Sequence, residues 1–154
     1  MTFKISLDSS ILISHLAGDS HKDDVLSAVE RLSQLEAELF FSVVCYAEVW
    51  TGIELMYDGQ KKELATTSFT DILDTNNFMI VADNITIARD ATRAQAAYRR
   101  RGGKRESLVP DFLIGANATY FSGRLLTTNP RDFLRSFPNL EVLTPMDLLE
   151  KYTA

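Results

Sequence analysis

Near its amino terminus the sequence reads Lys4-Ile5-Ser6-Leu7-Asp8-Ser9-Ser10, a short apolar run that ends in a polar turn. The run is typical of a strand over residues 4–7, and the serines predict a turn that caps a helix over residues 11–16. Asp8 is therefore expected at the carboxyl end of a strand, where α/β proteins gather their binding residues.

The rest of the chain repeats this order, because short apolar runs alternate with segments of helical periodicity. Further strands are expected over residues 39–44, 78–82, 124–127 and 141–143. Helices are expected from about residue 20, around Glu48, and over residues 61–73, 85–101 and 110–120. The alternation predicts an α/β fold, a three-layer α/β/α sandwich whose central sheet is mainly parallel and covered by helices on both faces.

The composition is that of an ordinary globular chain. With 154 residues, 45% of them hydrophobic, the sequence is expected to form a single domain over residues 1–154 around one core. No apolar stretch approaches the roughly 20 residues that cross a bilayer, so we expect no membrane span. A single cysteine, Cys45, excludes an internal disulfide and a thiolate cluster, and the absence of a signal peptide adds to the expectation of a cytoplasmic protein.

Three acidic residues stand in apolar surroundings: Asp8, Glu48 and Asp111. Asp8 and Asp111 have an alternative interpretation, because a carboxylate in the first turn of a helix stabilises that helix by about 0.3–1 kcal/mol. Glu48 is harder to explain by structure alone, since an unpaired carboxylate in an apolar helix is costly unless a cation or a donor meets it. Together the three residues predict a shared cation.

Carboxylate oxygens are the ligands that hard cations such as Mg²⁺ or Mn²⁺ prefer. A cation held in this way polarises a phosphodiester and lowers the pKa of a bound water that attacks phosphorus. The acidic residues therefore predict metal-dependent hydrolysis of a phosphodiester, and neither histidine of the chain is needed for it.

A further polar segment follows the strand predicted over residues 124–127. In this segment Asn129 and Asp132 are candidates for another position of the site. The alternative is a turn held by an Asx-type hydrogen bond, which asparagine before proline favours by itself. The residues leave both interpretations open.

Basic residues crowd the end of the helix predicted over residues 85–101, on a chain whose net charge is -5. One role for such residues is to complement the dipole at a helix carboxyl terminus. Another is contact with RNA phosphates, which requires clustered lysine and arginine. The candidates for contact with the RNA backbone are Arg99, Arg100, Arg101, Lys104 and Arg105.

Four segments, in their order and spacing, resemble the PIN-domain family and look closest to the VapC-like toxins of type II toxin–antitoxin pairs. They are residues 7–13, the helix around Glu48, residues 110–118 and residues 126–133. The resemblance implies a parallel sheet and a Mg²⁺- or Mn²⁺-dependent endoribonuclease site. It also implies inhibition by a small cognate antitoxin and assembly into a homodimer.

The resemblance further implies roles for individual residues. By motif position, Asp8 and Asp111 would be metal ligands, and Glu48 would complete the acidic triad. Ser9 or Ser10 would support Asp8 by hydrogen bonding. The segment Thr127-Thr128-Asn129 would supply the fourth position, with Asp132 nearby.

One residue departs from the pattern of the resemblance, because some relatives have an aspartate where this chain has Asn129. The departure removes one negative charge from the site. It leaves open an alternative function, in which a PIN-like protein of weak catalytic activity serves as a partner-binding or regulatory domain.

Two other classes of protein gather acidic residues after a first strand, and the sequence fits neither. Phosphatases of the haloacid dehalogenase type have a second aspartate two residues after the first, where this chain has Ser10. Receiver domains need adjacent acidic residues early in the chain and a lysine after a late strand, and this pattern is also missing.

Overall fold

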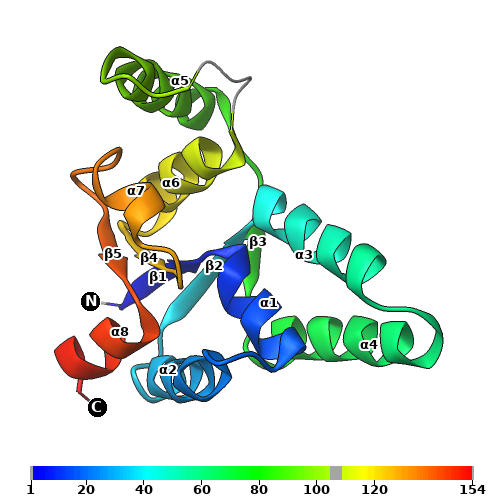
Figure 1. Ribbon diagram of the computed structural model, residues 1–154. Helices are drawn as coiled ribbons and strands as arrows, with labels where there is room; N and C mark the ends of the chain where they lie inside the picture. Colours follow the sequence, from blue (N-terminus) through cyan, green and yellow to red (C-terminus); the bar gives the residue numbers. More distant parts are fainter. Residues whose placement is uncertain (1, 105–108, 154) are drawn as a thin grey trace.

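Five parallel strands form one sheet in the order β3-β2-β1-β4-β5 (Figure 1). The computed structural model describes residues 2–104 and 109–153 of the chain. The strands are β1 (Lys4–Leu7), β2 (Glu38–Ser42), β3 (Met79–Val81), β4 (Arg124–Leu126) and β5 (Glu141–Leu143). The helices are α1 (Ser9–Ala17), α2 (Lys22–Gln34), α3 (Val43–Met56), α4 (Gly59–Thr75), α5 (Ile85–Arg100), α6 (Pro110–Phe121), α7 (Arg131–Leu134) and α8 (Pro145–Lys151).

The order of the strands places β1 at the centre of the sheet, between β2 and β4. Ile5 of β1 pairs with Leu39 on one side, and Ser6 pairs with Leu125 on the other. The chain winds outward from β1 through β2 to β3, and then returns to add β4 and β5 on the opposite side. The direction of winding therefore reverses between β1 and β4, which is where open α/β sheets bind their ligands.

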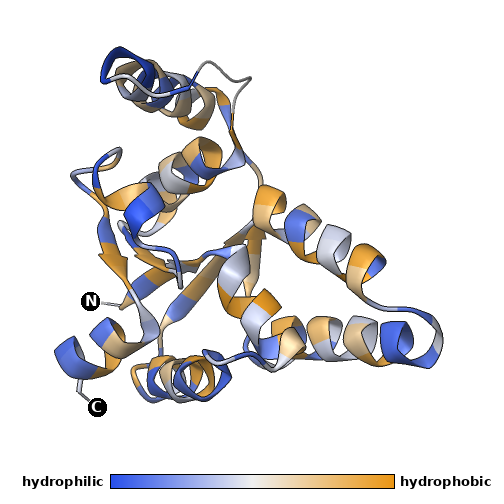
Figure 2. Cartoon of the chain, viewed as in Figure 1, coloured by the Kyte–Doolittle hydropathy of each residue, from blue (hydrophilic) through white to orange (hydrophobic). Residues whose placement is uncertain are grey.

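Helices cover both faces of the sheet (Figure 1). On one face α6 packs against β1, β2 and β4, and α5 lies against α6. On the other face α2 contacts both α1 and α8. Figure 2 shows the strands largely in the colours of apolar residues, and Ile5, Leu7, Phe41 and Leu125 are fully buried between the layers. The predicted three-layer sandwich with a parallel sheet is confirmed.

Local signals start the two helices that carry acidic residues of the candidate site. The Ser42 side chain accepts a hydrogen bond from the Cys45 backbone N–H at 3.1 Å, so β2 ends at Ser42 and α3 begins with the next residue. The strand predicted over residues 39–44 is therefore too long at its carboxyl end. Pro110 begins α6, where the N–H that proline lacks would have no partner within the helix.

Two of the described helices, α7 and α8, are absent from the sequence prediction. The last segment is fixed to the body of the protein, because Arg31 Nη1 of α2 donates to the Tyr152 carbonyl oxygen at 2.6 Å. The Tyr152 hydroxyl in turn donates to Glu141 Oε1 of β5 at 2.6 Å. Among the helices that the structure describes, none combines the length and apolar character needed to cross a membrane.

Candidate active site

A cavity of about 480 Å³ lies at the carboxyl ends of β1 and β4. Asp8 directly follows β1, Glu48 comes from the second turn of α3, and Asp111 comes from the first turn of α6. The wall of the cavity includes Asp8, Ser9, Ser10, Glu48, Asp111, Thr128, Asn129 and Asp132. The structure thus brings candidate residues from four separate segments around one cavity.

Hydroxyl groups hold the Asp8 carboxylate. Its Oδ2 accepts hydrogen bonds from Thr127 Oγ1 at 2.8 Å and from Ser10 Oγ at 2.9 Å. Asp8 is only 5% exposed, yet it forms no ion pair with any residue that the structure describes. The carboxylate is therefore fixed in orientation while its negative charge stays without a compensating cation from the described chain.

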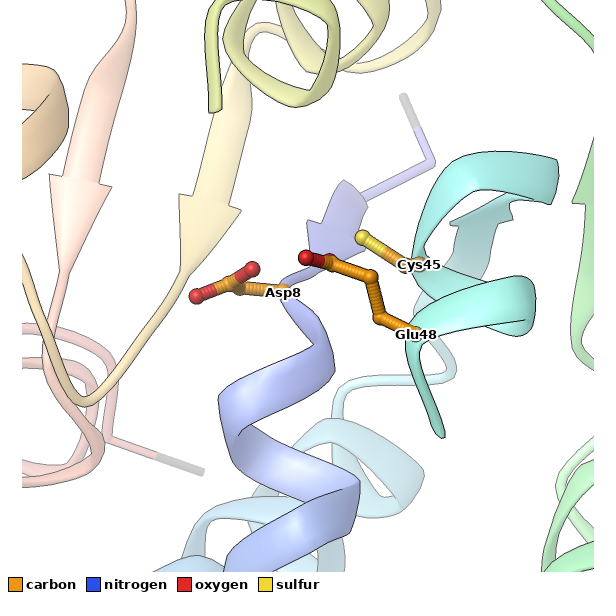
Figure 3. Close-up of side chains that lie close together, drawn as sticks. All are labelled: Asp8, Cys45 and Glu48. Carbon is orange, nitrogen blue, oxygen red and sulfur yellow. The ribbon is translucent and has the colours of Figure 1, made fainter. Parts of the chain in front are cut away.

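Glu48 and Cys45 reach the same place from α3. Ser9 Oγ donates to Glu48 Oε1 at 2.9 Å and lies 3.5 Å from Asp8 Oδ1, so it links the two carboxylates. Figure 3 shows both α3 side chains pointing toward the start of α1, where Asp8 lies. One potential ligand atom from each of Asp8, Cys45 and Glu48 lies within 4.8 Å of the others. Within the described residues, this is the group whose spacing suits a single metal ion.

Asp111 faces the same cavity but lies outside this tight group. Burial, together with the negative charges of Asp8, Asp132 and Glu48, raises the pKa of Asp111 from 3.8 to about 6. The four carboxylates therefore act on one another electrostatically across the cavity. Asp111 occupies a second position in the site, next to the pair formed by Asp8 and Glu48.

Burial is also the main cause of the raised pKa values of Asp8 and Glu48. Burial raises the pKa of Asp8 even though hydrogen bonds from Thr127 and Ser10 act in the opposite direction. Burial also raises the pKa of Glu48, and the charge of Asp8 adds to this effect. Each carboxylate makes the ionised form of its neighbours less favourable, so the cluster is a place where a divalent cation would lower the free energy.

The thiol of Cys45 contributes differently. Burial, followed by the charge of Asp8, raises the pKa of Cys45 above its usual value, so the sulfur stays protonated near neutral pH. A protonated thiol is a poor metal ligand, and carboxylate oxygens therefore dominate the donor set. Such a set fits a hard cation.

Asn129 and Asp132 both line the cavity, and both are exposed. The Thr127 hydroxyl accepts a hydrogen bond from the Asn129 backbone N–H at 3.0 Å. In the part of the chain that the structure describes, the Asn129 side chain makes no hydrogen bond. The turn is therefore held by a threonine, and the Asx-type hydrogen bond considered from the sequence is not found. The Asn129 amide remains available to a ligand in the cavity.

Sequence reasoning missed several residues that line this region or support it from nearby, among them Cys45, Asn117 and His21. Cys45 precedes Glu48 by three residues, and this helical spacing alone places both on one face of α3. Asn117, which is 1% exposed, donates from Nδ2 to Asp83 Oδ1 at 2.9 Å and so ties α6 to the segment after β3. His21, which nothing in the sequence assigned to the site, also lines the cavity.

The basic residues at the end of α5 lie in different surroundings. Arg101 lines a neighbouring cavity that shares Asp111 with the candidate site. Arg99 lines a separate hollow beside Thr92 on α5. Arg100 and Lys104 are exposed and belong to neither wall, and Arg105 lies outside the described residues.

The fold and the site together define a class of protein, a parallel α/β/α domain that gathers carboxylates where its winding direction reverses. Comparison with protein families matches residues 5–136 to the PIN domain, and the chain belongs to this family. The resemblance seen in the sequence is thereby confirmed at the level of the family. No curated protein is significantly similar to the chain in sequence.

Solved structures share the fold at low sequence identity. A chain of VapBC2 from Rickettsia felis, bound to a promoter DNA fragment, is 18% identical with a TM-score of 0.71, covering 92% of this chain and 98% of that chain. A chain of DNA-bound VapBC from Salmonella typhimurium is 17% identical with a TM-score of 0.70, covering 94% and 99%. A chain of FitAcB from Neisseria gonorrhoeae is 18% identical with a TM-score of 0.71, covering 92% and 98%. At this identity the likeness shows the fold.

Proposed function

We propose that this protein is a divalent-metal-dependent endoribonuclease and the toxin of a toxin–antitoxin pair. The observation that carries the proposal is the cavity lined by Asp8, Glu48 and Asp111 at the reversal point of a PIN-domain sheet. Structural similarity to chains of VapBC and FitAB complexes supports the toxin assignment. The reaction would be hydrolysis of an RNA phosphodiester by water.

The residues of the cavity fit Mg²⁺ or Mn²⁺. Asp8 and Glu48 would hold the cation directly, and Asp111 would bind from the facing side of the cavity. Asn129 would offer a carbonyl oxygen, which hard cations accept. Their raised pKa values support this assignment, because each carboxylate would regain its ordinary acidity beside a positive charge.

A bound divalent cation would supply charge stabilisation at the phosphate and lower the pKa of an attacking water. The protein's own residues would do the positioning. Thr127 and Ser10 fix the orientation of Asp8, and Ser9 fixes Glu48 relative to Asp8. Since hydroxyl groups do this without adding positive charge, the site keeps its full attraction for cations.

A partner antitoxin is the second part of the proposal. A toxin that cleaves cellular RNA needs an inhibitor, and the complexes named above contain such partner proteins. The end of α3 and the second turn of α4 carry exposed apolar side chains that a partner would cover: Leu55 is 82% exposed, Met56 54% and Leu64 64%. We also propose that the protein forms a homodimer and acts in the cytoplasm.

The test is a cleavage assay with single-stranded RNA and with single-stranded DNA of the same sequence. We expect cleavage of the RNA in Mn²⁺ or Mg²⁺, no cleavage in EDTA, and loss of cleavage in Asp8→Asn. Asp71→Asn is the matched control, because Asp71 is exposed on α4 and does not line the cavity. Equal cleavage by wild type and Asp8→Asn would overturn the site, and preferential cleavage of DNA would overturn the substrate.

A second function is favoured by one specific observation, the neutral Asn129 amide at the wall of the cavity. With one carboxylate fewer, the protein would serve as a partner-binding or regulatory domain of weak catalytic activity. This alternative predicts at most slow cleavage at any concentration of Mn²⁺ or Mg²⁺ and a stable complex with a partner protein. Faster cleavage by Asn129→Asp than by the wild type would instead indicate that Asn129 belongs to a working nuclease site.

A further inference from the structure

A second cavity, of about 430 Å³, adjoins the candidate active site. The two cavities share Asp111 and Asp132 in their walls, so they adjoin each other at these two residues. The far wall comes from the end of α5 and from the segment after β4. We call this cavity the arginine groove, defined by Tyr98, Arg101, Arg131 and Arg135.

Positive charge dominates the far wall of the arginine groove. Arg131 begins α7, and Arg135 directly follows the last residue of this helix. The two arginines are four positions apart, so they lie about one helical turn apart on the same side. In the part of the chain that the structure describes, the guanidinium groups of Arg101, Arg131 and Arg135 make no ion pair and no hydrogen bond.

These unpaired arginines contrast with an arginine that serves the fold. Arg124 Nε donates to Glu141 Oε1 at 3.0 Å, and its guanidinium lies 4.3 Å from the centre of the Phe3 ring. Among the residues that the structure describes, the arginines of the groove have no such partner, and they face a concave surface on a chain of net charge -5. Guanidinium groups in this state are ready to bind an anion with several oxygen atoms.

We propose that the arginine groove binds the phosphate backbone of the RNA strand next to the bond that is cleaved, an inference that rests on the proposed function. A strand whose scissile phosphate lies between the carboxylates must continue into an adjoining space, and the groove adjoins the cavity at Asp111 and Asp132. Arg131 and Arg135 contact one phosphate from α7, and Arg101 contacts it or its neighbour from α5.

Nucleic acid fits the groove better than an acidic peptide does. Tyr98 is 39% exposed and lines the groove, so its ring offers a surface on which a base can stack. The carboxylates of an acidic peptide gain nothing from such a ring. It would also place its carboxylates against Asp111 and Asp132 without supplying the phosphate that the cation site needs.

The position of Tyr98 is fixed by a close contact with the backbone. A Cβ atom at Gly103 would lie 2.3 Å from the Tyr98 ring, so a larger residue at this position would require the ring to move. The turn after α5 therefore contributes to the shape of the groove.

The experiment measures binding without requiring catalysis. In an Asp8→Asn background, fluorescence anisotropy of a labelled single-stranded RNA is recorded over a range of salt concentrations. For Arg131→Gln with Arg135→Gln we expect the Kd to rise at least about tenfold, because two charged contacts with phosphate are lost. The slope of log K against log salt should fall by about 1.4 if two phosphate contacts are lost.

The matched control is Arg89→Gln with Lys61→Gln, which removes the same charge. Both residues are exposed, form no ion pair in the described chain and line neither cavity. We expect this control to change the Kd less than twofold. Lysine at positions 131 and 135 keeps the charge without the planar guanidinium, and should restore part of the affinity.

The outcomes separate this inference from the proposed function. Arginine-dependent binding by a protein that fails to cleave RNA would support the groove and contradict the nuclease. Unchanged or equally weakened RNA binding in both double variants would overturn the groove, even if the wild type cleaves RNA. If Arg131→Gln with Arg135→Gln loses binding to poly-glutamate but binds RNA as the wild type does, the inference is overturned in favour of an acidic peptide.

Discussion

Thr127 is the residue on which the geometry of the site most depends. It is fully buried, and its hydroxyl donates to Asp8 Oδ2 while accepting from the Asn129 backbone N–H. One side chain thus sets both the orientation of a proposed metal ligand and the shape of the loop after β4. The role of Thr127 can be tested separately from its packing, since valine has nearly the same shape.

We predict that Thr127→Val lowers the rate of RNA cleavage by roughly 10–100-fold, the range found when groups that orient metal ligands are removed. The variant should stay folded, because valine fills the same space. Steady-state cleavage and far-UV circular dichroism provide the measurements. Thr70→Val is the control, since the Thr70 hydroxyl donates to carbonyl oxygens of α4 and lies outside the cavity. Wild-type cleavage by Thr127→Val would contradict this role.

Asp111 gives a prediction about stability in the absence of metal. In the folded protein its pKa is raised from 3.8 to about 6, so between these values the folded state binds more protons than the unfolded state. The ionised carboxylate therefore destabilises the fold above pH 6, and this effect fades as the pH falls below 6. Asp111→Asn should be more stable than the wild type at pH 7.5, with a smaller difference at pH 5.

Urea unfolding in EDTA at the two pH values measures this difference. The comparison between wild type and Asp111→Asn measures the ionisation of Asp111 together with its electrostatic coupling to Asp8 and Glu48. A difference in unfolding free energy that stays constant from pH 5 to pH 7.5 would show that Asp111 does not titrate near 6.

At the scale of single residues, the sequence predicted which residues lie around the site but not the distances between them. Ser9 or Ser10 was predicted to support Asp8, and Thr127 was predicted in the segment that supplies the fourth position. The structure shows hydrogen bonds from Ser10 and Thr127 to Asp8. That Asp111 lies apart from the tight group of Asp8 and Glu48 depends on how α6 packs, which no local pattern encodes. The catalytic roles of these residues stay predictions.

Among the elements, α6 depends most closely on a single small residue. Gly115 is buried in this helix against Phe137, and a Cβ atom at Gly115 would lie 2.2 Å from the Phe137 ring. Alanine is normally a better helix former than glycine by about 1 kcal/mol. Here the collision outweighs that gain, because the ring and the helix must move apart.

We predict that Gly115→Ala lowers the free energy of unfolding by about 1–3 kcal/mol, the usual cost of overpacking. Gly52→Ala is the matched control on α3, since no atom lies within 4 Å of a Cβ atom placed there. This control should be neutral or stabilise by up to about 1 kcal/mol. Equal stability changes in the two variants, measured by urea unfolding, would contradict the packing described for α6.

The sequence predicted long elements better than short ones. Helical periodicity predicted α2, α4, α5 and α6, but α7 has only four residues, fewer than a periodic pattern needs. The start of α8 carries a sequence signal for a helix amino terminus that the prediction did not use. Thr144 accepts from the Asp147 N–H and Asp147 accepts from the Thr144 N–H, a capping box with Pro145 in the first turn.

For the whole molecule, the topology explains why residues far apart in sequence meet. Asp8 and Thr127 are separated by 119 positions, and they touch because β1 and β4 are neighbours where the winding direction reverses. The alternation of strands and helices predicted the class of fold. It did not predict the order β3-β2-β1-β4-β5, because local sequence contains no direct record of which strands pair.

The edge of the sheet at β3 leads to a prediction about assembly. Within the described sheet β3 pairs only with β2, and apolar side chains are exposed on or next to it. They are Val43 at 45%, Met79 at 38%, Ile80 at 42% and Ile85 at 89%. Such a surface favours burial against another protein chain.

We predict that a second copy of this chain covers the β3 edge, and that Ile85→Glu shifts the protein from dimer to monomer. Sedimentation velocity at several protein concentrations measures the change. Met146→Glu is the control, because Met146 is 47% exposed on α8, away from β3. A wild type that stays monomeric at high concentration would contradict the prediction.

The central claim is that the carboxylates of this PIN domain hold a divalent cation, and Mn²⁺ binding followed by electron paramagnetic resonance tests it most directly. Wild-type protein titrated with Mn²⁺ should lose the signal of the free ion as the ion binds. Asp8→Asn should bind at least about tenfold more weakly, since one charged ligand is lost. Equal Mn²⁺ binding by the wild type and Asp8→Asn, or no binding by either, would contradict the claim.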